Sequence, residues 1–277
     1  MPKPLLQELI VTLYGLYGRS GLLPVAHLVA LLADLGVEEG AARSTVSRLK
    51  SKGVLERTDG TTPVAYRLSP AVLDGFHAGD ERIFTPRRSE PGDPWALVVF
   101  SVPETERKRR YELRTELTSL GFGFVAAGVA IAPATVLDQA LDRLAARGLT
   151  RYLEHFTGQY GEGEVLRERI GQWWDLGELD AAYGEFVADY DPVVQQWSAR
   201  TEAAPDLDED GRREAFAQYI PLLTRWRRFP YRDPNIALEL LPVGWKAPRA
   251  KLVFLQLHGM LSGPAQDHAR SVLGASV

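Results

Sequence analysis

The stretch ARSTVSRLKSKGVLERTDGTTPVAYRLSP, from Ala42 to Pro70, decides the fold at the start of this 277-residue chain. Its first part combines small apolar residues with cations and hydroxyls at helical spacing, which predicts an amphipathic helix that ends at Gly53. Two short strand-like runs follow on either side of Asp59-Gly60, a residue pair that favours a tight hairpin turn. The stretch therefore predicts a helix followed by a β-hairpin.

The expected helix has one side for a core and one side for solvent. Ala42, Val46 and Leu49 share the apolar side at the helical repeat. The opposite side combines cations and hydroxyls and holds no carboxylate: Arg43, Ser44, Ser47, Arg48, Lys50 and Ser51. Arginine pairs bidentately with guanine in the major groove, and serine hydroxyls reach bases or phosphates. This side is therefore a candidate DNA-reading surface.

The cations gather here although the whole chain has a formal net charge of -4. Between Ala42 and Pro70, six basic residues stand against Glu56 and Asp59, a local balance of +4. Arg57 and Arg67 flank the hairpin turn, where we expect them to meet backbone phosphates. The alternative explanation is the solvated basic face of an ordinary three-helix domain.

The whole chain is expected to form an α+β fold of three domains. Residues 1–90 are expected to form three helices and a hairpin, the arrangement of a winged helix-turn-helix. Residues 91–160 open with the apolar run Trp95–Phe100, typical of a strand covered on both faces, and continue in the ferredoxin-like order β-α-β-β-α-β. Residues 161–277 are expected to be mostly helical.

Composition excludes several classes of protein. The chain has no cysteine, which excludes disulfides, thiolate zinc sites and cysteine nucleophiles. Its five histidines lack the spacing of metal ligands, so we expect no metal and no cofactor. The uncharged stretch Thr118–Leu137 is long enough to span a bilayer, but its glycines and proline favour two strands around a turn. We therefore expect a cytoplasmic protein without a membrane partner.

A second cluster, RWRRFPYRDP from Arg225 to Pro234, concentrates guanidinium groups and aromatic rings. Guanidinium groups match phosphate geometry, and aromatic faces stack on adenine or aryl groups. The candidate effector-binding residues are Arg225, Trp226, Arg228, Tyr231 and Arg232. DNA contact is one alternative, and a helix end whose aromatic side chains belong to a core is another.

A third stretch, Gln172–Phe186, places Asp175, Glu178 and Asp180 among aromatic residues. Neighbouring carboxylates are the residues of acid–base catalysis. The simpler interpretation is a buried helical stripe with solvated acids around it. That stripe consists of Trp173, Leu176, Leu179 and Tyr183.

Four stretches together resemble the PaaX-type regulators, the phenylacetate-degradation repressors, in the same order along nearly the whole chain. They are LIVTLYGLYGR (Leu9–Arg19), RSTVSRLKSKGVLER (Arg43–Arg57), GDERIF (Gly79–Phe84) and FPYRDP (Phe229–Pro234). The resemblance implies a winged helix, a central ferredoxin-like domain and a helical C-terminal domain. It also implies a dimeric repressor of aromatic-acid catabolism, released by an acyl-coenzyme A thioester such as phenylacetyl-CoA.

The expected partners are a second copy of the chain and double-stranded operator DNA with inverted half-sites, because two-fold protein symmetry is mirrored in the operator. Two other functions stay open. One is a DNA-binding protein without an effector. The other is a metal-dependent nuclease on the central domain, which looks like small CRISPR nucleases in which an aspartate ends the first strand. Ser101 stands at that place here, so we expect no enzyme.

Overall fold

The computed structural model describes residues 5–18, 21–58, 64–70, 72–73, 83–84, 87–161, 164–203 and 206–274. The chain is α+β, with helices and two small antiparallel sheets. It divides into two compact units, which we call unit 1 and unit 2. Unit 1 holds the described residues of Met1–Glu81, Glu185–Arg227 and Pro248–Val277, and unit 2 those of Arg82–Gly184 and Arg228–Ala247. The boundaries of the three expected domains, 1–90, 91–160 and 161–277, stay a prediction.

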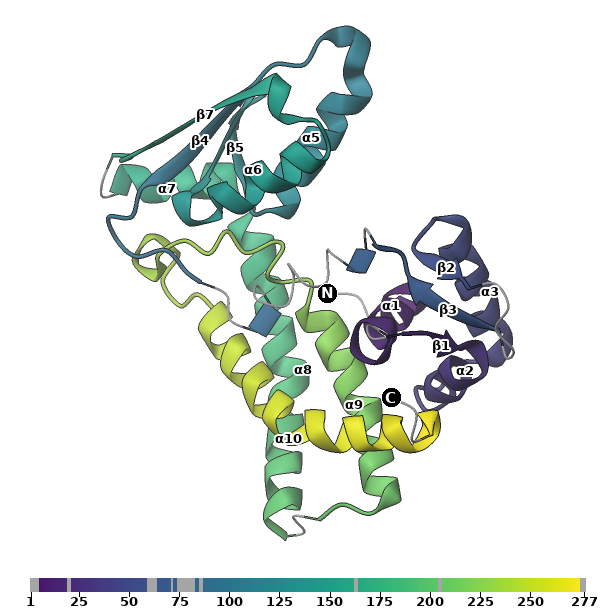
Figure 1. Ribbon diagram of the computed structural model, residues 1–277. Coiled ribbons are helices and arrows are strands. Elements are labelled where there is room, and N and C mark those ends of the chain that lie inside the picture. The colour runs from purple at the N-terminus through teal and green to yellow at the C-terminus, as the bar shows by residue number, and fades with distance from the viewer. Residues whose placement is uncertain are drawn as a thin grey trace. The chain divides into compact units, whose positions relative to one another are not determined.

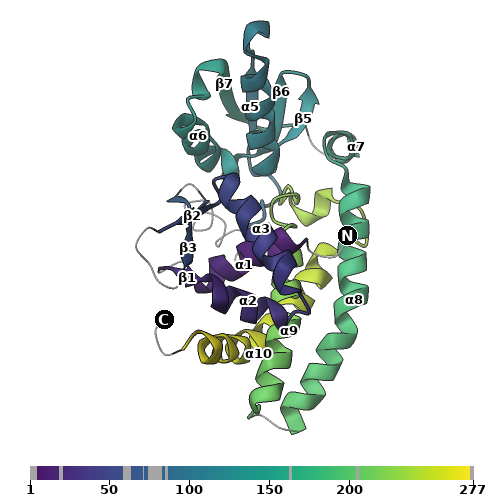
Figure 2. The same ribbon diagram turned by 90° about the vertical axis from the view of Figure 1, so that its right-hand side faces the viewer.

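Unit 1 begins with three helices and a three-stranded sheet (Figure 2). The helices are α1 (Leu6–Tyr17), α2 (Val25–Ala33) and α3 (Glu39–Ser51). The strands are β1 (Leu23–Pro24), β2 (Leu55–Arg57) and β3 (Ala65–Leu68), in the order β1-β3-β2. The three helices and both hairpin strands agree with the sequence prediction, whereas β1 was not foreseen. The expected turn at Asp59-Gly60 lies outside the described residues.

Long helices complete unit 1. They are the part of α8 (Leu176–Ala203) that follows Gly184, then α9 (Glu209–Trp226), and α10 (Ala247–Leu273) from Pro248 onward. The buried Oγ1 of Thr224 in α9 donates a hydrogen bond to Oγ1 of Thr12 in α1, at 2.9 Å. His268 Nε2 in α10 lies 2.8 Å from Oδ2 of Asp34, which follows α2. The N-terminal helices therefore share one core with helices from the end of the chain.

Unit 2 is built around a four-stranded antiparallel sheet. Its elements are β4 (Trp95–Phe100), α5 (Arg107–Ser119), β5 (Gly123–Ala126), β6 (Val129–Pro133), α6 (Leu137–Ala146) and β7 (Leu153–Gly158). The order along the chain is the predicted β-α-β-β-α-β, and the strands lie side by side as β5-β6-β4-β7. Helix α7 (Glu164–Trp173) follows β7.

The sheet of unit 2 has one covered face and one face that is open only in part, because Trp95 and Ile131 on that second face are buried. Helices α5 and α6 pack on the first face (Figure 1). Val98 of the sheet, Leu117 of α5 and Leu144 of α6 belong to one hydrophobic core there. On the other face Val99 is 39% exposed and Phe156 is 61% exposed. The expectation that Trp95–Phe100 is covered on both faces therefore holds at Trp95 and fails at Val99. A continuous apolar run shows that both sides are apolar, not that both have a partner.

The uncharged stretch Thr118–Leu137 holds β5 and β6, as the sequence predicted. Within the described residues, no helix is both long enough and apolar enough to cross a membrane. Gly123 in β5 lies so close to the segment after α7 that an added Cβ would come within 2.7 Å of the Trp174 ring. Close packing thus explains why a glycine stands at this place.

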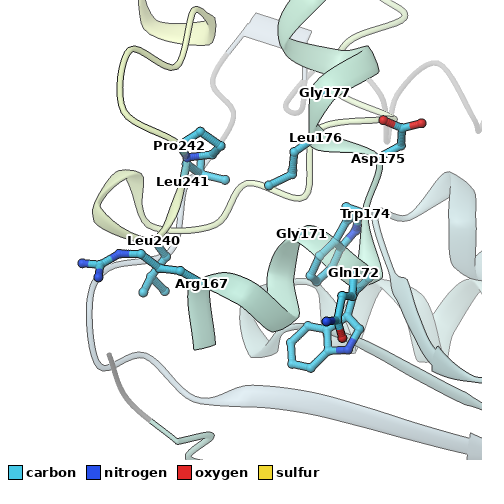
Figure 3. Close-up of a pocket in the computed structure, with 11 residues that line it drawn as sticks. Arg167, Gly171, Gln172, Trp174, Asp175, Leu176, Gly177, Leu240, Leu241 and Pro242 are labelled. Carbon is cyan, nitrogen blue, oxygen red and sulfur yellow. The ribbon is translucent and has the colours of Figure 1, made fainter. Parts of the chain in front are cut away.

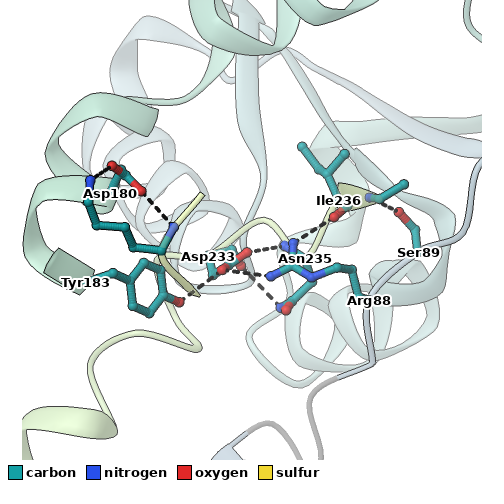
Figure 4. A network of polar contacts seen from close by, with 9 residues as sticks. Arg88, Ser89, Asp180, Tyr183, Asp233, Asn235 and Ile236 are labelled. Carbon is teal, nitrogen blue, oxygen red and sulfur yellow. Dashed lines mark hydrogen bonds and ion pairs between the residues drawn. The ribbon is translucent and has the colours of Figure 1, made fainter. Parts of the chain in front are cut away.

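A buried carboxylate ties three segments of unit 2 together (Figure 4). Asp233 Oδ2 accepts hydrogen bonds from the Tyr183 hydroxyl at 2.9 Å and from Arg88 Nη2 at 3.1 Å. Its Oδ1 accepts one from the backbone N–H of Asn235 at 2.7 Å, and Arg88 also donates to the carbonyl oxygen of Ile236 at 2.7 Å. Burial, and secondarily Asp233, raise the pKa of Tyr183 well above its ordinary value. The hydroxyl therefore stays protonated and donates.

We predict that Asp233→Ala lowers the free energy of unfolding by about 3–5 kcal/mol, because it leaves the Arg88 guanidinium half-buried without its partner. Tyr183→Phe removes a single donor and should cost about 1 kcal/mol. Asp267→Ala is the matched control: its ion pair with Arg270 is exposed, so it should change stability by less than about 1 kcal/mol. Urea unfolding followed by circular dichroism measures all three. Equal stability of Asp233→Ala and the control would contradict this role.

Candidate nucleic-acid interface

Helix α3 has the orientation that its sequence predicted. Ala42, Val46 and Leu49 are buried at 0%, 3% and 4% exposure. The predicted DNA-reading residues Arg43, Ser44, Ser47, Arg48, Lys50 and Ser51 are all exposed. The helix ends at Ser51, two residues before Gly53, whose φ of +69° favours glycine and whose N–H donates to the carbonyl oxygen of Lys50 at 2.9 Å. The buried side thus fixes the direction in which the cations and hydroxyls point.

Side chains on this face of α3 make short contacts along the helix. Arg48 Nη2 donates to Oγ1 of Thr45 at 2.9 Å, and the Ser51 hydroxyl donates to the carbonyl oxygen of Arg48 at 2.9 Å. Arg43 Nε donates to Oε1 of Glu39 at 2.7 Å, with both side chains exposed. The first turn of α3 therefore adds a carboxylate at the edge of a face that was expected to have none.

The hairpin places its two predicted cations differently. Arg67 on β3 lies directly opposite Glu56 on β2, and its Nη2 donates to Glu56 Oε2 at 3.1 Å. Both side chains are exposed, so the pair is weak and open to exchange with a phosphate. Arg57 is exposed at the last position of β2, before the hairpin tip that lies outside the described residues.

The first two predicted effector residues belong to the core of unit 1. Arg225 is only 6% exposed, and its Nη1 donates to Asp189 Oδ2 at 2.5 Å. Its guanidinium also lies over the Phe186 ring, at 5.7 Å from the centroid. Trp226 is 3% exposed and stacks on Phe254, with the ring centroids 4.5 Å apart. As effector-binding residues, Arg225 and Trp226 therefore find no support in the structure.

The other three residues lie in unit 2, beyond the point where the chain leaves unit 1. Arg228 is half-buried. Tyr231 and Arg232 line a small cavity of about 150 Å³ together with Trp174, and Arg232 Nη2 donates to Glu178 Oε1 at 2.7 Å. The five predicted effector residues thus divide between the two units, and their role as one site stays a prediction.

A larger groove in unit 2 was missed by the sequence analysis (Figure 3). Its volume is about 550 Å³, and its walls come from Arg167–Gly177, at the end of α7 and the start of α8, and from Leu240–Pro242. Trp173, Trp174 and Leu241 supply apolar surface. The wall side chain Arg167 donates through Nε to the carbonyl oxygen of Glu239 at 3.0 Å. The two walls are far apart in the sequence, so no local pattern indicates the groove.

The acidic residues near the groove have structural partners. Asp175 Oδ1 accepts from the N–H of Glu178 at 2.9 Å, in the first turn of α8, and Asp180 pairs with Lys246. The stripe predicted beside them is buried, with Trp173, Leu176, Leu179 and Tyr183 each under 9% exposed. This confirms the buried stripe predicted within Gln172–Phe186. Of the acids around it, Asp175 is exposed as expected, whereas Asp180 is half-buried and held by its partner instead of being solvated.

The central sheet of unit 2 is where a nuclease site would lie. Ser101 follows β4 and is exposed, and its backbone N–H donates to the carbonyl oxygen of Tyr152 at 2.9 Å. Among the residues that the structure describes, no group of three His, Cys, Asp or Glu side chains is placed to hold a metal ion.

Three family models match consecutive parts of the chain. Residues 6–72 match "PaaX-like protein", residues 88–170 match "PaaX protein central Cas2-like domain", and residues 174–271 match "PaaX-like protein C-terminal domain". The matches follow one another in the order of one family and leave only short gaps.

Two further proteins are similar to this chain. The "Transcriptional repressor PaaX" of Escherichia coli (strain K12) is 26% identical over 256 residues, which cover 91% of this chain and 78% of that protein. A solved structure, the "Uncharacterized protein Rv0674 from Mycobacterium tuberculosis", has a similar fold, with a TM-score of 0.51 and 23% identity, covering 89% of this chain and 90% of that one. With three successive family models along its length, the chain belongs to the PaaX-like family.

Proposed function

We propose that this protein is a DNA-binding transcriptional repressor, in which α1–α3 and β1–β3 form a winged helix-turn-helix. The observation that carries the proposal is the exposed face of α3, where cations and hydroxyls stand opposite a buried apolar side. An α-helix fits the major groove of DNA, and a helix anchored by its other side presents these groups in a fixed direction. The name of the Escherichia coli relative supports the same function.

The charge distribution favours local contact with DNA. The whole chain carries a formal net charge of -4, so nonspecific attraction of DNA to the entire surface is weak. Arg43, Arg48 and Lys50 concentrate positive charge on α3, where phosphate contact releases counterions and guanine contact selects sequence. We therefore assign positioning and base reading to the same helix.

We propose a homodimer that binds inverted half-sites in double-stranded DNA. One winged helix reads few base pairs, so selective repression needs two of them. The sheet of unit 2, which we assign to the ferredoxin-like fold, has a partly open face with Val99 and Phe156 exposed. Covering this face with a second copy would remove apolar surface from water, and we propose it as the dimer surface.

We propose an acyl-CoA thioester, such as phenylacetyl-CoA, as the effector that releases the repressor. The indole rings that line the groove suit an aryl group, and the cations Arg167 and Arg232 suit the phosphates of the coenzyme. For a near-complete switch, the effector must favour the released form by roughly 3–5 kcal/mol.

A metal-dependent nuclease is the second candidate, because the matching family model describes the central domain as Cas2-like. The serine at position 101 lacks the carboxylate that such an enzyme would use to hold a metal at the end of its first strand. We therefore propose a regulator without enzymatic activity. Divalent-metal-dependent cleavage of operator DNA would favour the nuclease instead.

We predict that Arg48→Ala weakens operator binding by about 5- to 150-fold, since removing one bidentate base pairing corresponds to roughly 1–3 kcal/mol. The side chain is exposed, so the thermal unfolding midpoint should stay close to that of the parent. Arg270→Ala, an exposed arginine on α10, serves as control. Gel-shift titration measures binding. Parent-like affinity of Arg48→Ala would show that α3 does not read the operator.

The exposed ion pair Arg67–Glu56 on the hairpin leads us to expect opposite changes in DNA affinity when either partner is substituted. Arg67→Gln should lower affinity for operator and unrelated duplex alike and reduce the salt dependence by about one unit of slope. Glu56→Gln should raise both affinities, because it frees Arg67 from its carboxylate partner. Fluorescence anisotropy at several salt concentrations tests both variants. If Arg67→Gln affects the operator alone and leaves the slope unchanged, phosphate contact is refuted.

Sedimentation of the protein with operator DNA tests dimer and effector together. We predict two chains on each inverted repeat and release of the DNA when phenylacetyl-CoA is added. Arg232→Gln and Arg167→Gln should keep operator binding and respond to the thioester only at much higher concentrations. A single chain on the operator contradicts the dimer. A panel of acyl-CoA thioesters without any effect contradicts the effector.

A further inference from the structure

Helix α5 of unit 2 carries a second outward face with the composition of the α3 face. Its inward side, with Leu113 and Leu117, is completely buried against the sheet. Its outward side, which we call the α5 outer face, has five exposed residues. They are Arg107, Lys108, Tyr111, Thr115 and Thr118. Two cations and three hydroxyls thus point outward from a helix that the core holds in place, and Glu112 stands only at their edge.

Cations crowd the first turn of α5. The turn holds the four consecutive cations Arg107–Arg110 and no acidic residue, although Glu104 and Glu106 stand immediately before it. The N-terminal end of a helix dipole is positive, so cations there are unfavourable by roughly 0.3–1 kcal/mol each. A run of residues that weakens its own helix indicates a selective reason other than folding.

Structural partners account for only part of this run. Arg110 donates to the carbonyl oxygen of Val102 at 2.8 Å and to Glu104 at 2.9 Å, so it supports the fold. Arg107 also reaches Glu104, at 3.0 Å, but that pair is 80% and 67% exposed and therefore weak. Lys108 has no hydrogen bond or ion pair through its side chain to any residue that the structure describes.

Tyr111 stands out among the aromatic residues of the described chain. Tyr111 is 76% exposed, although burial of a tyrosine ring normally stabilises the fold. It lies one turn after Arg107 and Lys108, and the hydroxyls of Thr115 and Thr118 continue the same side. From Lys108 to Thr118 the face extends about 15 Å at 1.5 Å per residue, the length of roughly four base pairs of duplex.

We propose that the α5 outer face binds the phosphodiester backbone of DNA, as a contact surface separate from α3. Arg, Lys, Thr and Tyr side chains are the usual donors to phosphate oxygens, and a face without a central carboxylate does not repel them. Contacts to phosphate carry no information about base sequence, so we expect this contact to form on any duplex. The proposal rests on the function proposed above, and it adds a backbone contact from unit 2 to the reading of bases by unit 1.

The test compares two double variants of the full-length protein. Arg107→Gln with Lys108→Gln removes two cations from the α5 outer face. Arg169→Gln with Lys251→Gln removes two cations from α7 and α10 and serves as the matched control. Affinity for operator and for an unrelated duplex is measured by anisotropy over a range of salt concentrations.

The α5 double variant should bind both duplexes more weakly by the same factor. The slope of log affinity against log salt should become shallower by roughly 1.8, at about 0.9 for each phosphate that is no longer neutralised. The control should keep the parent slope. Equal slopes for the two double variants, with a parent that binds DNA, would overturn the α5 contact and leave the repressor function standing. A parent that binds no DNA at low salt would overturn both.

A stability measurement separates binding from a structural role. Lys108→Gln removes a cation from the first turn and breaks no side-chain bond among the described residues, so its thermal unfolding midpoint should equal or exceed that of the parent. Weaker DNA binding together with unchanged or higher stability supports the proposal. A lower midpoint with parent-like DNA affinity would show that Lys108 serves the fold and would overturn it.

Discussion

The carboxylate of Asp233 is the interaction on which the architecture of unit 2 depends. It is 2% exposed, and Arg88, the Tyr183 hydroxyl and a backbone N–H all donate hydrogen bonds to it. A buried charge with fewer partners would cost several kcal/mol, so the three donating segments must stay together. The chain continues from this point to Leu240–Pro242, one wall of the groove. The position of that wall therefore follows from the network around Asp233.

The same network explains the composition of the FPYRDP stretch. Phe229 stacks on Tyr183 with the ring centroids 4.2 Å apart, and Asp233 accepts the hydroxyl of that tyrosine. Arg225 neutralises Asp189, and Arg232 neutralises Glu178. Guanidinium groups and aromatic rings suit a phosphorylated ligand. In this stretch, however, most of the guanidinium groups and rings that we describe pair with carboxylates or stack on rings of the protein itself. Residue type alone cannot separate the two uses, because both satisfy the same charge and the same stacking surface.

The two helices with basic outer faces, which we propose as DNA contacts, share the same arrangement of buried and exposed sides. On both α3 and α5, the apolar side of the helix is buried and the cations lie on the opposite, exposed side. Exposed ion pairs such as Arg43–Glu39 and Arg107–Glu104 are weak, so a phosphate can replace the carboxylate at little cost. In the proposed repressor, the acidic balance of the rest of the chain would limit DNA binding to these faces.

The sequence by itself determined the features that rest on local periodicity. The orientation of α3, the order of strands and helices in unit 2 and the buried stripe from Trp173 to Tyr183 all follow from apolar spacing within one segment. Only the tertiary structure decided where the partners of each segment lie. Strand β1 has two residues and exists through its pairing with β3, and the groove joins Arg167–Gly177 to Leu240–Pro242. The burial of Arg225 and the partly open face of the sheet likewise depend on contacts between distant residues, about which a local pattern carries no information.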